Sequence, residues 1–199
     1  GFEGWWYEGG GIYRHVWLTK LDPVHVAHWG TFVTAEVPGG DEGRADEATL
    51  TIRTTVADDG EAPVRATLLS RIVDPSGKEV ASARDEVALG AGSAREVTQR
   101  VRVLRPALWS IETPNLYRLR TTILVRGKAV DETWTTFGIR TIRFDKDHGF
   151  FLNGKPVKIM GTCNHQDFAG VGIALPDRCH VYKIEKLKEM GSNAYRCAH

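Results

Sequence analysis

The chain has 199 residues, of which 42% are hydrophobic and 26% are charged, and its formal net charge is +1. This length accommodates one large domain, or one small domain with parts of its neighbours, and the composition is that of an ordinary globular protein. A charge so near neutral offers no broad basic surface for nucleic acid, and no apolar run reaches the length of a membrane span.

Residues 1–22 are rich in glycine and aromatic side chains. Three consecutive glycines, residues 9–11, indicate a tight backbone path that a Cβ would obstruct. A strand is predicted after them from the bulky residues Ile12, Tyr13, Val16 and Trp17. Neither end of the chain tapers into polar residues, so we expect the chain to be part of a longer protein.

Residues 24–142 have an all-β pattern. Apolar and polar residues alternate with period two in the segments 31–37, 49–56 and 97–103. Turn signals separate the segments, for example Asp58-Asp59-Gly60. About seven or eight short strands of this kind predict an immunoglobulin-like β-sandwich. That architecture serves many functions and implies none by itself. Trp109, Tyr117 and Trp134 are expected in its core or at an interface.

The pattern changes after residue 143. Asn153-Gly154 predicts a type I′ turn in a β-hairpin whose second strand runs through Met160. A helix is predicted from Pro176-Asp177 to Gly191, and a strand follows at residues 193–197. Strand, helix and strand of these lengths form a βαβ unit with parallel strands. One such unit cannot bury both faces of its strands, so we expect it to open a larger α/β domain.

Two polar clusters follow the predicted parallel strands. Residues 163–167 (Cys-Asn-His-Gln-Asp) follow the first strand, and residues 196–199 (Arg-Cys-Ala-His) end the second. The carboxyl ends of neighbouring parallel strands meet at one rim, where functional residues of α/β folds collect. Two imidazoles, a guanidinium and a carboxylate at that rim are suited to binding sugar hydroxyls.

The same region contains all three cysteines, Cys163, Cys179 and Cys197, and histidines near each of them. An odd, clustered number of cysteines argues against a disulfide framework. The spacings typical of structural zinc are absent, so we expect reduced thiols and no metal site.

Five ordered segments resemble motifs of the glycoside hydrolases of family 2, the β-galactosidase-like enzymes. The segments are GGGIYRHVWL at 9–18, LWS…PNLY at 108–117, FGIR…LNGKPV at 137–157, GTCNHQD at 161–167 and NAYRCAH at 193–199. The resemblance implies a mainly β fold with three parts. Residues 1–22 would end a jelly-roll sugar-binding domain, residues 23–142 would form the immunoglobulin-like sandwich, and residues 143–199 would begin a (β/α)8 catalytic barrel.

The resemblance further implies a retaining glycosidase that cleaves terminal β-linked sugars through a covalent glycosyl-enzyme. A β-galactoside is the first choice of substrate, with a β-glucuronide or β-mannoside as the alternative. The catalytic glutamates of the family lie on later barrel strands, so the 199-residue chain itself is expected to be inactive. A non-catalytic β-sandwich that binds carbohydrate or spaces domains is the alternative from another class.

The expected substrate-binding residues are His199, Arg196, His165 and Asp167. His199 would hydrogen-bond sugar hydroxyls, and Arg196 would orient a catalytic carboxylate or form a structural ion pair. His165 and Asp167 would line the site or fix their loop. We expect carbohydrate as the partner and no cofactor in this segment. Some relatives use magnesium or sodium, and the sequence leaves oligomeric state and compartment open.

Overall fold

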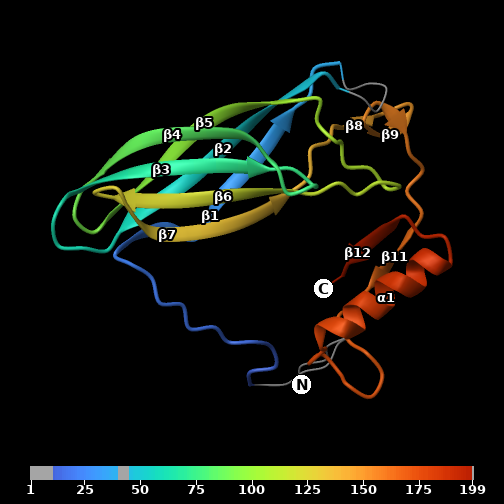
Figure 1. Cartoon of the computed structure of the whole chain (residues 1–199). Coiled ribbons are helices and arrows are strands. Elements are labelled where there is room, and N and C mark those ends of the chain that lie inside the picture. Colours follow the sequence, from blue (N-terminus) through green and yellow to red (C-terminus); the bar gives the residue numbers. More distant parts are fainter. Residues whose placement is uncertain (1–10, 40–44, 199) are drawn as a thin grey trace. The chain divides into compact units, whose positions relative to one another are not determined.

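The computed structural model describes residues 11–39 and 45–198. The chain divides into two compact units, Lys20–Val157 and a second unit made of Gly1–Thr19 and Lys158–His199. The described residues are mainly β-strand and contain one α-helix (Figure 1). No described helix is long and apolar enough to cross a membrane. The domain boundaries expected from the sequence stay predictions.

Seven antiparallel strands form two sheets in the larger unit. One sheet has the order β1-β2-β5, made of Val24–Glu36, Glu47–Asp58 and Ser93–Leu104. The other has the order β4-β3-β6-β7, made of Glu79–Leu89, Val64–Val73, Tyr117–Val125 and Lys128–Phe137 (Figure 1). This arrangement of three and four strands is an immunoglobulin-like sandwich. The predicted fold class is confirmed.

The alternation of side chains along the strands explains why the sheets pack face to face. Leu50 and Ile52 of β2 have no exposed surface, whereas Arg53, which lies between the buried residues Ile52 and Thr54, faces solvent. The same core cluster contains Ile72 of β3 and Leu119 of β6, also fully buried. Burying one such side chain stabilises the fold by about 1.5 to 3 kcal/mol, so these positions hold the sandwich together.

Tyr117, at the start of β6, fixes one end of the sandwich. Its side chain is buried, and its hydroxyl accepts a hydrogen bond of 2.9 Å from the backbone N–H of Ala107. Burial raises the pKa of the Tyr117 hydroxyl. A tyrosine bonded back to the preceding chain at this strand is the tyrosine corner of immunoglobulin-like domains. The core position expected for Tyr117 is confirmed, but Trp134 lies outside the core with 48% of its surface exposed.

A small hairpin sheet, in the order β10-β9-β8, belongs to the larger unit. Its strands are Ile142–Asp145 (β8), Gly149–Leu152 (β9) and Lys155–Pro156 (β10). Asn153 and Gly154 join β9 to β10 with φ angles of 48° and 73°. Two consecutive positive φ angles define a type I′ turn, so the predicted turn is confirmed.

The second unit contains the predicted βαβ motif. Strands β11 (Gly161–Asn164) and β12 (Ala194–Cys197) pair in parallel, and helix α1 (Asp177–Glu189) lies between them in the sequence. Gly191 follows the helix with a φ of 91°, as a C′ glycine does. The βαβ prediction is confirmed. That it opens a barrel stays a prediction.

The first parallel strand differs in its bounds from the sequence prediction. The hairpin strand ends at Pro156, and β11 begins separately at Gly161, so Cys163 and Asn164 lie within the strand. A Cβ on Gly161 would come within 2.5 Å of the Ala194 carbonyl oxygen. This glycine therefore allows the close approach of β12 that starts the strand.

The strand predicted around Ile12 is wrong for the residues described, since 11–23 contain no strand. Ile12 and Trp17 are about four-fifths exposed, at 82% and 81%. A strand needs a neighbour for its backbone hydrogen bonds, and none of the described strands pairs with this segment. The jelly-roll assignment of residues 1–22 stays a prediction, and Gly9 and Gly10 lie outside the described residues.

We expect amide hydrogen exchange to separate the two units. The sandwich closes its own core, whereas α1 has no buried residue and β11 pairs with β12 alone. Amides of β2, β3 and β6 in the monomeric 199-residue chain should exchange at least 100-fold more slowly than those of β12. Equal protection of β12 and β2 would contradict this expectation.

Candidate functional site

The carboxyl ends of β11 and β12 meet at one edge of their two-stranded sheet. The register pairs Cys163 with Arg196 and Asn164 with Cys197. Beyond these pairs, the backbone N–H of Ala198 donates to the carbonyl of Asn164 at 3.0 Å. The two segments that contain the predicted site residues are therefore held side by side up to Ala198.

Arg196 projects from one face of this sheet. A pocket that α1 helps to line, here called the helix-side pocket, lies at the other face. Alternation places Cys163 and Arg196 on one face, with Asn164 and Cys197 on the opposite face. A pocket of about 650 Å³ is lined by Asn164 and Cys197 together with His180 of α1. Arg196 and Cys163 do not line it, so they lie on the face turned away from α1.

The Arg196 guanidinium is exposed and contacts the neighbouring strand. Its Nη1 donates to Sγ of Cys163 at 3.4 Å. A thiol is a weak acceptor, which leaves most donors of the guanidinium available for an anionic group. No ion pair joins Arg196 to a carboxylate in the part of the chain that is described.

His165 and Asp167 lie in the loop after β11, and the helix holds that loop through its backbone. Lys183 Nζ donates to the carbonyl oxygens of His165 and Asp167, at 2.9 and 2.6 Å. The ring of Phe168, next in the chain, lies 5.7 Å from the same ammonium group. Lys183 therefore fixes the backbone path of the loop from α1, a role that the sequence did not reveal. His199 lies outside the described residues.

Arg14 is a second positioning residue that the sequence did not identify, although it belongs to a recognised motif. It donates to the Leu175 carbonyl and forms a 2.8 Å ion pair with Asp177 in the first turn of α1. The hydrogen bond and the charge of Arg14 lower the pKa of Asp177. Tyr13 and Arg14 also line the pocket beside α1. Arg14 therefore holds the start of the helix.

The three cysteines are free. Cys163 and Cys197 lie on adjacent strands but on opposite faces of the sheet. Among the described residues, no group of three or more His, Cys, Asp or Glu side chains could hold a metal ion.

Two of the motif segments, 108–117 and 137–157, meet at a structural junction in the larger unit. The Trp109 N–H donates to the Ile139 carbonyl at 2.8 Å, and a Cβ on Gly138 would lie 3.0 Å from Cβ of Trp109. Asn153 has two side-chain bonds of 3.0 Å there, donating to the Trp109 carbonyl and accepting from the Thr141 N–H. These motif residues join the hairpin to the sandwich.

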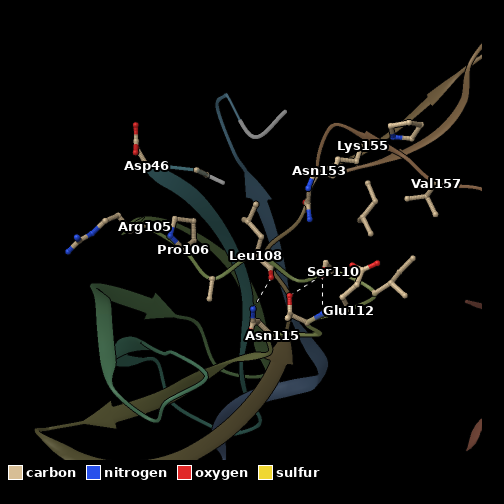
Figure 2. A pocket seen from close by; sticks show the side chains of 16 residues that line it. Asp46, Arg105, Pro106, Leu108, Ser110, Glu112, Asn115, Asn153, Lys155 and Val157 are labelled. Atoms are coloured by element: carbon tan, nitrogen blue, oxygen red, sulfur yellow. Dashed lines mark hydrogen bonds between the residues drawn. The ribbon is translucent and has the colours of Figure 1, made fainter. Parts of the chain in front are cut away.

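A pocket of about 710 Å³ lies beside this junction, entirely within the larger unit (Figure 2). Figure 2 shows Asp46 and Arg105 on one side, Lys155 and Val157 on the other, and Leu108 between them. Arg105 has a φ of 46°, and its N–H donates to the Asp46 carbonyl at 2.7 Å. The described residues that line it mix polar and apolar side chains, and none of the strand-end residues after β11 and β12 is among them.

The chain is similar to known proteins over nearly its whole length. Residues 28–140 match the family described as glycosyl hydrolases family 2. The beta-galactosidase BoGH2A of Bacteroides ovatus is 40% identical over 194 residues, which are 98% of this chain and 22% of that protein. The chain thus spans about a fifth of that relative's length.

Two solved structures are likewise similar to nearly the whole chain. A glycosyl hydrolase family 2 member from Bacteroides cellulosilyticus has a TM-score of 0.89 at 39% identity, over 98% of this chain and 26% of that one. Bacteroides uniformis beta-glucuronidase 2, solved covalently bound to cyclophellitol-6-carboxylate aziridine, has a TM-score of 0.86 at 37% identity. That match covers 96% of this chain and 23% of the other.

Proposed function

The chain belongs to family 2 of the glycosyl hydrolases, and from this membership we propose that the complete protein is a retaining glycosidase that removes terminal β-linked sugars. The observation that carries the proposal is the meeting of two motif-bearing strand ends at one edge, with Arg196 on the face away from α1. In barrels, helices cover the outside and functional side chains collect at the carboxyl ends of the strands.

The proposed reaction proceeds in two displacements at the anomeric carbon. A carboxylate attacks that carbon while a carboxylic acid protonates the departing glycosidic oxygen. Water, deprotonated by the same acid/base group, then releases the sugar with retained configuration. The two carboxyl groups must lie roughly 5 Å apart, and Asp167 cannot supply such a pair alone.

The residues of the strand-end rim would bind and orient rather than break bonds. Arg196 has guanidinium donors available, and we propose that it orients a catalytic carboxylate by a charge-assisted hydrogen bond. His199, His165 and Asp167 would bind hydroxyl groups of the sugar. The sequence resemblance leaves magnesium or sodium open for the complete protein, and neither ion enters the steps above.

We propose a β-galactoside as the substrate. The 40% identity to a named beta-galactosidase supports this choice, and the 37% identity to a named beta-glucuronidase supports a β-glucuronide as the alternative. A β-mannoside is a third candidate, which rests on the sequence resemblance alone.

Rates on a panel of aryl β-glycosides test the proposal. The complete protein should hydrolyse the β-galactoside with the highest kcat/KM, at least tenfold above the glucuronide and mannoside. The 199-residue chain alone should show no turnover, because its rim lacks the carboxylate pair. Turnover by the purified chain that Asp167→Asn abolishes would overturn the assignment of catalysis to other residues. Inactivity of the complete protein on all three glycosides would favour the non-catalytic carbohydrate-binding module.

A further inference from the structure

The outer face of the sheet β4-β3-β6-β7 contains a row of arginines that ends at a tryptophan. The register aligns Arg71 of β3 with Arg120 of β6, and Arg120 with Trp134 of β7. Arg118 occupies the neighbouring outward-facing position of β6, two residues before Arg120. We call these four residues the Trp134 surface.

Two of the three guanidinium groups of this surface, those of Arg118 and Arg120, lie against the indole ring. Cζ of Arg118 is 5.0 Å from the ring centroid, and Cζ of Arg120 is 5.7 Å from it. Both distances are within the range of cation–π attraction. Trp134 nevertheless keeps 48% of its surface exposed, so the ring is held by its neighbours and still accessible.

The charges of the Trp134 surface are only partly neutralised. Arg120 forms a 2.6 Å ion pair with Glu132, and Arg71 lies 3.7 Å from Glu79. The hydrogen bond from Arg120 lowers the pKa of Glu132. Within the residues described, no carboxylate pairs with Arg118. Like charges directly opposite each other, as Arg71 and Arg120 are, weaken a sheet. Because Glu79 and Glu132 pair with Arg71 and Arg120, the excess positive charge of this surface lies at Arg118, beside the indole ring, and it is complementary to an anion.

We propose that the Trp134 surface binds an anionic sugar polymer, with a carboxylate or sulfate on the guanidinium groups and a sugar ring against the indole. A guanidinium fork matches two oxygens of such an anion. The negative face of an indole favours the polarised C–H groups of a pyranose ring. Membership of a glycosyl hydrolase family favours a sugar polymer over an acidic peptide. Binding is measured without turnover, so this proposal does not depend on which glycoside the protein cleaves.

The other sheet provides a matched control. On its outer face Arg53 lies 5.2 Å from the ring centroid of Phe32, which is 55% exposed. This pair has an exposed ring with one guanidinium, whereas the Trp134 surface has a larger ring with two. Substitutions at Phe32 or Arg53 should therefore leave polymer binding within twofold of the unmodified protein.

Affinity electrophoresis of the complete protein tests the proposal, with hyaluronan as a carboxylate polymer, chondroitin sulfate as a sulfated polymer and dextran, which has no galactose, as a neutral one. Binding to at least one anionic polymer should exceed binding to dextran at least tenfold and weaken as salt rises. Preference for hyaluronan or for chondroitin sulfate identifies which anion is recognised. Trp134→Ala and Arg118→Ala should each weaken binding at least fivefold, and Trp134→Tyr should retain most of it. Circular dichroism and thermal unfolding check that each variant is folded.

Several results would overturn the proposal. Equal binding of dextran would show that the anion is not recognised, and an equal loss in Phe32→Ala or Arg53→Ala would show that binding is not specific to the Trp134 surface. An effect of Arg118→Ala without one of Trp134→Ala would indicate general charge attraction instead of a ring site. Absence of binding to both anionic polymers at low salt would also exclude it. If the alanine variants fail to fold, Trp134→Thr and Arg118→Gln replace them, because threonine suits a strand and both changes remove the ring or the charge, and each should weaken binding at least fivefold.

Discussion

Arg196→Ala in the complete protein is expected to lower kcat/KM about 100-fold or more, with little change in the melting temperature. Arg196 lies on the sheet face turned away from α1, and Cys163 Sγ is the hydrogen-bond partner that the structure gives it. Losing a donor to a group whose charge matters in the transition state costs about 3 to 4 kcal/mol of transition-state stabilisation. His199→Ala should act similarly, because hydrogen bonds to sugar hydroxyls strengthen as the transition state forms.

Cys197→Ser is the matched control for Arg196→Ala. Cys197 is the next residue of β12 and lines the helix-side pocket on the opposite face, so kcat/KM should stay within threefold. Steady-state kinetics and thermal unfolding of the same preparations separate the two roles considered for Arg196. A lower melting temperature with normal kcat/KM per folded molecule would show a structural ion pair, and the assignment to the site would be wrong.

The largest stability effect is expected at Asn153, which lies in the β9–β10 turn and is 4% exposed. Asn153→Gly removes the two side-chain hydrogen bonds to Thr141 and Trp109 but still permits the positive φ. Each bond lost leaves a backbone group without its partner, at about 1 to 2 kcal/mol, so the free energy of unfolding should fall by about 2 to 4 kcal/mol. Urea unfolding of the 199-residue chain, followed by tryptophan fluorescence, measures this.

Two further variants divide the Asn153 effect into its parts. Asn153→Ala adds the cost of a positive φ to the lost bonds, so it should be about 1 kcal/mol less stable than Asn153→Gly. Lys155→Ala, two residues further at an exposed position, should change the free energy of unfolding by less than about 0.5 kcal/mol. A loss below 0.5 kcal/mol in Asn153→Gly would show that its bonds do not stabilise the junction.

The elements that the sequence predicted correctly are those whose signal is local. Period-two alternation placed strands such as β2, and the pair Asn153-Gly154 specified a type I′ turn because both residues tolerate positive φ. The helix α1 was bounded by Pro176 and Gly191, one at each end. In each case the determining residues lie within a few positions of the structure they specify.

Which face of a strand is buried, and which segments pair as strands, was decided by the tertiary structure. Trp134 was expected in the core or at an interface, but β7 has threonines on both sides of it, so no alternation showed which face is inward. The segment around Ile12 has strand-like residues, yet no described strand pairs with it. Backbone donors and acceptors make a strand only where a neighbour accepts them.

The candidate site shows the same division. The sequence located the residues after two parallel strands, and the structure shows that the ends of β11 and β12 meet. It could not show that Lys183 and Arg14 hold the loop and the start of α1, because their partners lie 16 to 163 residues away along the chain. It also could not place two arginines of β6 beside the indole ring of Trp134 on β7. Local sequence specifies the conformation of a segment, whereas contacts between distant segments depend on the pairing that only the folded chain establishes.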